Sequence, residues 1–128
     1  MKIAVTLNKD NELKPLEEAE ILGIISADTK EIIRYQNPGY NISKELTMEA
    51  ILGLNVDAVV VKEKFLCPGS YGMSFGRLKY VLTQYANLND ILTNIDILTK
   101  HALDELEDSV YAESMNESGV CVDDDRPN

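Results

Sequence analysis

The feature that most constrains the fold of this chain is a near-continuous apolar run at residues 56–61, Val-Asp-Ala-Val-Val-Val. Such a run is typical of a strand buried on both faces, and strands of this kind usually lie in a parallel setting. A chain of 128 residues is long enough for one domain with its own hydrophobic core. The run therefore predicts the central strand of a single α/β domain.

Four further segments are rich in Ile, Val and Leu and predict strands. A short turn at residues 27–30 joins two of them into a hairpin, which ends at the sequence Asn-Pro-Gly of residues 37–39. The expected strands are Met1–Leu7, Glu20–Ser26, Glu31–Asn37, Val56–Val61 and Arg77–Thr83. Pro15 keeps the stretch after the first strand from forming an ordinary helix.

Two longer helices are expected among these strands. Ser43 can cap a helix over Lys44–Leu54, which carries an apolar face. Asn87 or Asn89 can cap another helix, whose apolar spacing continues through Val110. A hairpin followed by β-α-β units indicates an α/β sandwich with a mixed sheet.

Charge is distributed unevenly along the chain. Acidic residues outnumber basic residues by 22 to 12, giving a net charge of −10, and residues 101–128 hold nine acids and one base. Because nucleic acids and anionic membranes bind basic surfaces, general binding to either is not expected. The predicted organisation is a core domain at residues 1–98, an acidic helical extension at 99–116 and a disordered acidic tail at 117–128.

Nothing in the sequence predicts export or membrane insertion. No apolar run approaches the ~20 residues of a membrane-spanning helix, and the first residues lack the apolar stretch and cleavage site of a signal peptide. The two cysteines, Cys67 and Cys121, are too few for a disulfide framework. We therefore expect a cytoplasmic protein with free thiols.

The most informative stretch for function is the glycine-rich segment at residues 62–76. It follows the buried strand, and open α/β sheets bind ligands at the carboxyl ends of their strands. Glycines let backbone amides approach an anion, and Lys62, Lys64 and Arg77 would add positive charge. The same pattern also describes a loop that needs glycines only to turn. It is not a phosphate-binding P-loop, because no Gly-Lys-Ser/Thr follows the glycines.

Chemically reactive side chains are sparse in this sequence. The thiol of Cys67 could ligate a soft metal or an iron–sulfur species, although a lone cysteine is more often a packing residue. The only histidine, His101, has no recognisable partner and is interpreted as a surface residue. The acids at strand ends and turns suit capping roles, and Glu17, Glu18 and Glu20 are interpreted as a solvated edge. No catalytic set emerges, so the chain is not expected to be an enzyme.

The end of the last expected helix carries an apolar stripe beside its acidic residues, formed by Leu98, Ala102, Leu106 and Val110. The stripe can pack on the protein's own sheet. It can also form a docking surface for a basic partner or a second copy.

The chain resembles the dinitrogenase iron–molybdenum cofactor biosynthesis family, which comprises the small NifX-like proteins and the C-terminal domain of NifB. The resemblance covers about residues 1–98 and rests on an ordered set of short motifs. They are Met1-Lys2-Ile3-Ala4-Val5, Asn37-Pro38-Gly39, Leu54-Asn55-Val56-Asp57-Ala58-Val59-Val60, Gly76-Arg77-Leu78-Lys79-Tyr80-Val81 and Asn87-Leu88-Asn89-Asp90-Ile91-Leu92.

The resemblance implies a ribonuclease-H-like three-layer α/β sandwich whose five-stranded mixed sheet has the order 3-2-1-4-5. It also implies that the domain carries an anionic iron–sulfur or iron–molybdenum cluster, or a precursor, without being a catalyst. Family members commonly have a Ser-Pro-His-Phe-Gly-like stretch after the first strand, where this chain reads Leu-Lys-Pro-Leu-Glu-Glu at residues 13–18. No histidine ligand can therefore be carried over, and Lys62-Glu63 stands where Gly-Gly is usual.

Three functional hypotheses follow from the sequence. The leading one is a small non-catalytic carrier of a metallocluster or its precursor, with Cys67 as the metal ligand. The expected cluster-binding residues are Lys62, Lys64, Cys67, Pro68, Gly69, Ser70, Tyr71 and Gly72. The alternative is a metal-free protein-interaction module that acts through the acidic extension. A metal-dependent nuclease is the least favoured, because two-metal chemistry needs several converging acids.

Overall fold

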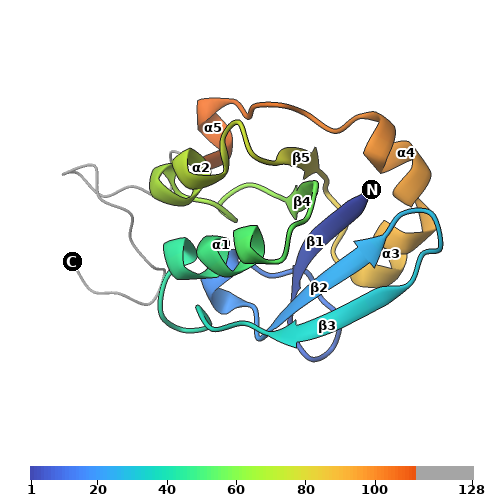
Figure 1. Cartoon of the computed structure of the whole chain (residues 1–128), viewed down its shortest axis with the longest axis horizontal. Helices are drawn as coiled ribbons and strands as arrows, with labels where there is room; N and C mark the ends of the chain where they lie inside the picture. Colours follow the sequence, from blue (N-terminus) through green and yellow to red (C-terminus); the bar gives the residue numbers. More distant parts are fainter. Residues whose placement is uncertain (112–128) are drawn as a thin grey trace.

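The computed structural model describes residues 1–111, and Figure 1 shows its arrangement. Its strands are β1 (Lys2–Leu7), β2 (Ile21–Ser26), β3 (Ile32–Gln36), β4 (Ala58–Val61) and β5 (Lys79–Leu82). Its helices are the 3-10 turn η1 (Leu16–Glu18), α1 (Lys44–Gly53), α2 (Pro68–Ser74), α3 (Leu88–Thr93), α4 (Ile95–Lys100) and α5 (Asp108–Tyr111). All five expected strands are present, and their bounds agree with the predicted ones within one residue, except that β4 and β5 start two residues later than predicted.

Within residues 1–111 the strands form one five-stranded sheet in the order β3-β2-β1-β4-β5. The hairpin strands β2 and β3 are antiparallel, and β2 is antiparallel to β1. The strand β4 pairs in parallel with both β1 and β5. The expected mixed sheet and its order are therefore confirmed, and all four residues of β4 are buried as the apolar run predicted.

Helices cover both faces of the sheet (Figure 1). On one face, the hydroxyl of Tyr80 in β5 hydrogen-bonds Ser74 of α2, and α1 lies beside α2. On the other face, Ile32 of β3 borders a groove together with Leu88 and Leu92 of α3. Apolar side chains from both layers join one core with the central strands. This is the three-layer α/β sandwich.

The predicted caps at the starts of two helices are confirmed. Ser43 Oγ accepts the amide of Leu46 at 3.0 Å and starts α1. Asn87, rather than Asn89, caps α3, because its Oδ1 accepts the amide of Asp90 at 3.0 Å. Residues 62–76 hold only the short helix α2.

The long last helix predicted from the apolar spacing is not formed. The chain breaks at Asn94, which ends α3 and precedes α4, and α4 ends at Lys100. Residues 101–107 run as an irregular segment along the sheet edge, where Leu103 exchanges two backbone hydrogen bonds with Tyr80 at 2.7 and 2.8 Å. Pairing with the edge strand β5 satisfies this backbone as well as a helix would. Only residues 108–111 are helical again, and the expected disordered tail at 117–128 lies outside the described residues.

The apolar side chains at the end of the chain pack against the core, not into solvent. Leu106 and Val110 are buried, and Ala102 and Leu98 are partly buried against the core cluster. For residues up to 111, the stripe thus packs on the protein's own core. No helix in this part of the chain is long and apolar enough to cross a membrane.

Candidate functional site

The candidate cluster-binding loop leaves the carboxyl end of β4 and leads into α2. Its turn is tight: the amide of Phe65 bonds the carbonyl of Lys62 at 3.1 Å, and Lys64 adopts a φ of 68°. Phe65 and Leu66 are buried and anchor the loop to the core. The loop's position at the end of a central parallel strand therefore agrees with the sequence expectation.

Cys67 lies at the start of α2 and is completely buried. Its backbone amide donates to Ser70 Oγ at 3.0 Å, and its sulfur lies 3.5 Å from the same hydroxyl. Cys67 is disulfide-bonded and is not a free thiol. The expectation of a free thiol at this position is therefore wrong for the oxidised protein, and metal ligation would require the reduced form.

The remaining predicted residues divide into an exposed and a buried group. Lys64, Gly69 and Gly72 are exposed, and Lys62, Pro68 and Tyr71 are partly exposed. Ser70 is buried, with its hydroxyl donating to the carbonyl of Cys67 at 3.2 Å. The exposed and partly exposed residues of the loop thus include two lysines and two glycines, whereas the hydroxyl of Ser70 and the sulfur of Cys67 are buried.

The end of the described chain covers one side of this loop. The amide of Lys64 donates to the carbonyl of Val110 at 2.9 Å, and the amide of Leu106 donates to the hydroxyl of Tyr71 at 3.0 Å. The rings of Tyr71 and Tyr111 are stacked with centroids 4.4 Å apart. No local pattern in the sequence predicted this contact, because the pairing depends on where the irregular segment turns after α4.

Beneath this contact, Tyr80 is buried with its hydroxyl 2.6 Å from Ser74 Oγ. Its ring also lies 5.4 Å from that of Tyr71. Burial raises the pKa of Tyr80 above its ordinary value of 10.0, and the hydrogen bond from Ser74 partly opposes this shift. The α2 region is therefore held by aromatic contacts and a few directed hydrogen bonds.

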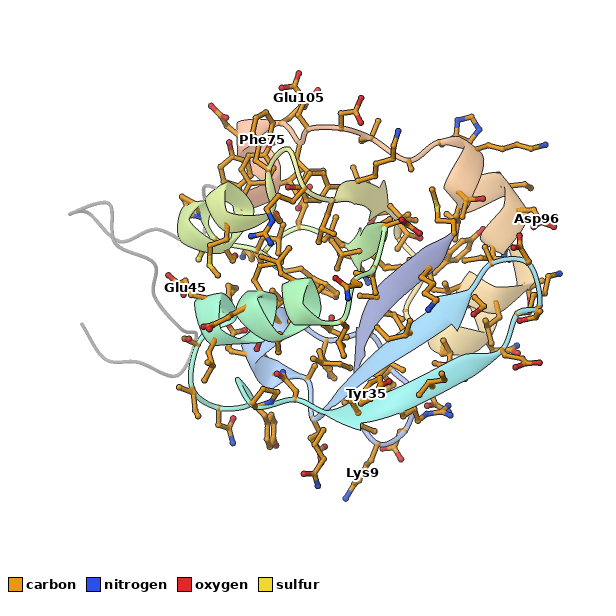
Figure 2. The ribbon with its side chains drawn as sticks, in the orientation of Figure 1. Lys9, Tyr35, Glu45, Phe75, Asp96 and Glu105 are labelled. Carbon is orange, nitrogen blue, oxygen red and sulfur yellow. The ribbon has the colours of Figure 1, made fainter. Side chains whose placement is uncertain are left out.

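Two cavities lie at other places in the part of the chain that the structure describes. One is an open groove of about 830 Å³, bounded by the loops after β1 and β5 and by β3, with Asp10, Arg34 and Asp90 at its walls. A second, of about 540 Å³, lies at the opposite end of the parallel strands, lined by Phe75 and Glu105, both labelled in Figure 2. None of the eight predicted cluster-binding residues lines either of these two cavities. Among residues 1–111, no group of three or more His, Cys, Asp or Glu side chains is placed to hold a metal ion.

A buried polar network under α1 was missed by the sequence reasoning. Glu17 was interpreted as part of a solvated edge, but its side chain is 4% exposed and forms an ion pair with Lys44, which is 2% exposed. The interpretation is wrong because η1 turns Glu17 inward, toward the first turn of α1. A lysine directly after a helix cap gives no sequence signal of burial, since that position is usually solvated.

Asn37 completes this network. Its side-chain amide donates to the carbonyls of Leu16 and Ala19 at 2.9 and 2.8 Å, and its Oδ1 accepts the amide of Gly39 at 2.9 Å. Thr47 of α1 donates to the same Leu16 carbonyl at 3.2 Å. The Asn-Pro-Gly motif at residues 37–39 is therefore a structural junction between η1, β3 and α1.

Comparison with known proteins supports the fold. No protein-family model matches the chain, and no curated protein matches it by sequence. Its structure is similar to the crystal structure of a putative dinitrogenase from Methanocaldococcus jannaschii, with a TM-score of 0.58 and 13% sequence identity. The match covers 80% of this chain and 91% of that one. The fold is thus dinitrogenase-like, as the sequence resemblance implied.

Proposed function

We propose that this chain is a non-catalytic, cytoplasmic binding protein that holds an anionic iron–sulfur or iron–molybdenum cluster, or a precursor, as cargo. The observation that carries the proposal is the dinitrogenase-like fold combined with the position of the 62–76 loop at the end of β4. Lys62 and Lys64 would attract the anion, and Gly69 and Gly72 are exposed in the same loop.

The protein ligand in this proposal is the thiolate of Cys67. Reduction of its disulfide and an outward movement at the start of α2 are both required, because the sulfur is completely buried. Thiolates are the preferred protein ligands of iron–sulfur clusters. With one cysteine in the loop, the lysines and amides would carry the rest of the binding energy, which favours a transferable cargo over a resident cofactor.

The test is anaerobic loading of the reduced protein with iron and sulfide, followed by visible absorption and metal analysis. We expect a stoichiometric chromophore in the wild type and its loss in Cys67→Ser. Cys121→Ser is the matched control, because it removes the chain's other thiol and keeps Cys67. A chromophore that survives in Cys67→Ser would overturn the assignment of the ligand. Loading that is insensitive to Lys62→Ala/Lys64→Ala would overturn the anion-binding role of the loop.

A metal-free interaction module is the second candidate, and the burial of Cys67 within a disulfide favours it. In this case the exposed acids of the 101–108 segment, such as Glu105 and Glu107, would bind a basic polypeptide. Polylysine is the probe, and Glu105→Lys/Glu107→Lys should weaken its salt-sensitive binding. Absence of any chromophore in the reduced wild type together with this loss would favour the module over the carrier. Unchanged polylysine binding in the double variant would contradict it.

A further inference from the structure

The free edge of the sheet at β3 is a regular strand without the features that usually protect an edge. Its pairing with β2 has no bulge between the pair of Ile21 with Gln36 and the pair of Ile25 with Ile32, and β3 contains no proline. Natural proteins protect such edges with lysines, prolines, bulges or covering segments, because an unpaired ladder is a template for another strand. Within residues 1–111 no element covers this edge (Figure 1).

The hydrogen-bond pattern identifies which backbone groups of β3 point outward. At the two ends of the hairpin, Ser26 donates to the carbonyl of Glu31, and Asn37 donates to the carbonyl of Glu20. Residues alternate along an antiparallel ladder, so residues 33 and 35 also face β2. The backbone groups of Ile32, Arg34 and Gln36 therefore point to the free edge, where they have no partner among the described residues.

One face of the same strand is apolar and open. Ile33 is 58% exposed and Tyr35 is 45% exposed, although both lie on the face that carries α1 and α2. Ile33 lies opposite Ile24 and Tyr35 lies opposite Leu22, both of which are buried. Figure 2 shows Tyr35 on β3, away from α1 and α2. The helices cover the centre of the sheet and leave this edge bare.

The charges of the strand favour a second copy of the chain as the occupant of the edge. The protein has a net charge of −10, which opposes self-association over most of its surface. The segment from Glu31 to Gln36 is an exception, because its one acid, Glu31, is balanced by its one base, Arg34. Two copies of this segment meet with no net charge, and each covers the other's edge at the same time.

A two-fold axis perpendicular to the sheet restricts the possible registers. It must place an outward-facing residue opposite another outward-facing residue, since only these have free backbone groups. An axis at Arg34 would put two guanidinium groups directly opposite each other, which is destabilising. An axis at Ile33 instead pairs Ile32 with Arg34 of the other copy and places the two Ile33 side chains side by side. In this register Tyr35 lies opposite Glu31, so the tyrosine hydroxyl can donate to the carboxylate.

We propose that two copies of this protein associate through antiparallel pairing of their β3 strands, with the two-fold axis at Ile33, into one continuous sheet. The pairing covers the exposed Ile33 and Tyr35 of both copies. It leaves the 62–76 loop accessible, because that loop lies on the far side of the central strands β1 and β4 from β3.

The register is tested by cysteine cross-linking of the full chain. Residues that face each other in a non-hydrogen-bonded pair have Cα atoms about 4.5 Å apart, which lies within the range that a disulfide can bridge. Ile33→Cys should therefore form a covalent dimer under mild oxidation. Tyr35→Cys is the matched control on the same strand and face, because it would lie opposite Glu31 and not opposite itself. The wild type shows how far the native cysteines cross-link.

Sedimentation velocity over a concentration series tests the association itself. We expect a reversible dimer in the wild type, and Ile33→Lys should raise its dissociation constant about tenfold, because two lysines would face each other at the axis. Ile42→Lys is the control, since Ile42 is 55% exposed and lies outside β3. A wild type that stays monomeric, equal cross-linking of Ile33→Cys and Tyr35→Cys, or equal effects of the two lysine variants would each overturn the proposal. None of these outcomes depends on cluster loading.

Discussion

The first turn of α1 and the region around α2 are held to the rest of the molecule by different kinds of contact. The first turn of α1 is joined to η1 and to the end of the hairpin by a buried ion pair and by side chains that bond backbone carbonyls, through Glu17, Lys44 and Asn37. The α2 region is joined to the end of the described chain by stacked rings and single hydrogen bonds, through Tyr71, Tyr80 and Tyr111.

The difference lies in what the loss of a single contact costs. A buried charge that loses its partner costs several kcal/mol, so the ion pair at the α1 junction is costly to break. One pair of stacked aromatic rings or one neutral hydrogen bond contributes about 1 kcal/mol, so the loss of a single contact between α2 and the end of the described chain should cost less. The candidate site thus lies beside the contacts whose individual losses cost less.

The largest effect is expected from breaking the buried ion pair. Lys44→Met should lower the free energy of unfolding by about 3–5 kcal/mol, because it removes the ammonium group from a buried ion pair. Urea denaturation measures the loss. The double variant Glu17→Gln/Lys44→Met should recover part of this loss. If its loss of unfolding free energy equals the sum of the losses in the two single variants, the two side chains are not energetically coupled.

A smaller but still large effect is expected at Gly39. A Cβ atom built there would lie 2.2 Å from Thr47 Oγ1 and 2.5 Å from the Thr47 backbone nitrogen, so α1 would have to shift. Gly39→Ala should therefore cost about 3 kcal/mol in the same denaturation assay. Gly53→Ala is the matched control in α1, where a Cβ meets nothing within 4 Å. It should leave stability unchanged or raise it by about 0.5 kcal/mol, because alanine restricts the unfolded chain. Equal losses would refute the steric argument.

The α2 region should respond more weakly and more locally. Tyr71→Phe keeps the stacked ring and removes the hydroxyl that accepts the Leu106 amide, which should cost about 1 kcal/mol. Hydrogen exchange should show lost protection at Leu106, with little change in α1. Tyr40→Phe, at an exposed tyrosine, is the control. Loss of protection spread evenly over the sheet would mean that the two regions are not separable.

The smallest effect is a dependence of stability on alkaline pH. Burial raises the pKa of Tyr80 in the folded state above 10.0, so the folded protein binds this proton more tightly than the unfolded chain does. Its contribution is fully present below pH 10 and is lost as the pH rises through the folded pKa. Tyr80→Phe should flatten the decline in stability above pH 10. An unchanged slope in denaturation midpoints would show that Tyr80 does not titrate differently in the two states.

The sequence predicted the elements and the sheet better than it predicted the site. Alternation and apolar runs identified all five strands, and Ser43 and Asn87 marked the helix starts, because these signals act over a few residues. The prediction of one long last helix was wrong, because the same apolar spacing suits an irregular segment that buries Leu106 and a short separate helix that buries Val110. The candidate loop was correctly predicted at the carboxyl end of β4, and the burial of Cys67 agrees with the packing alternative, but its disulfide was not predicted.

Patterns among neighbouring residues were enough to predict the α/β class and the central position of residues 58–61, and they also give residues 31–36 no net charge. The tertiary structure decided which polar groups are buried. Glu17 and Lys44 are 27 residues apart, and their ion pair forms only where η1 meets α1. It also decided that Ile33 and Tyr35 remain exposed, because a strand's place at the edge depends on the order of the whole sheet.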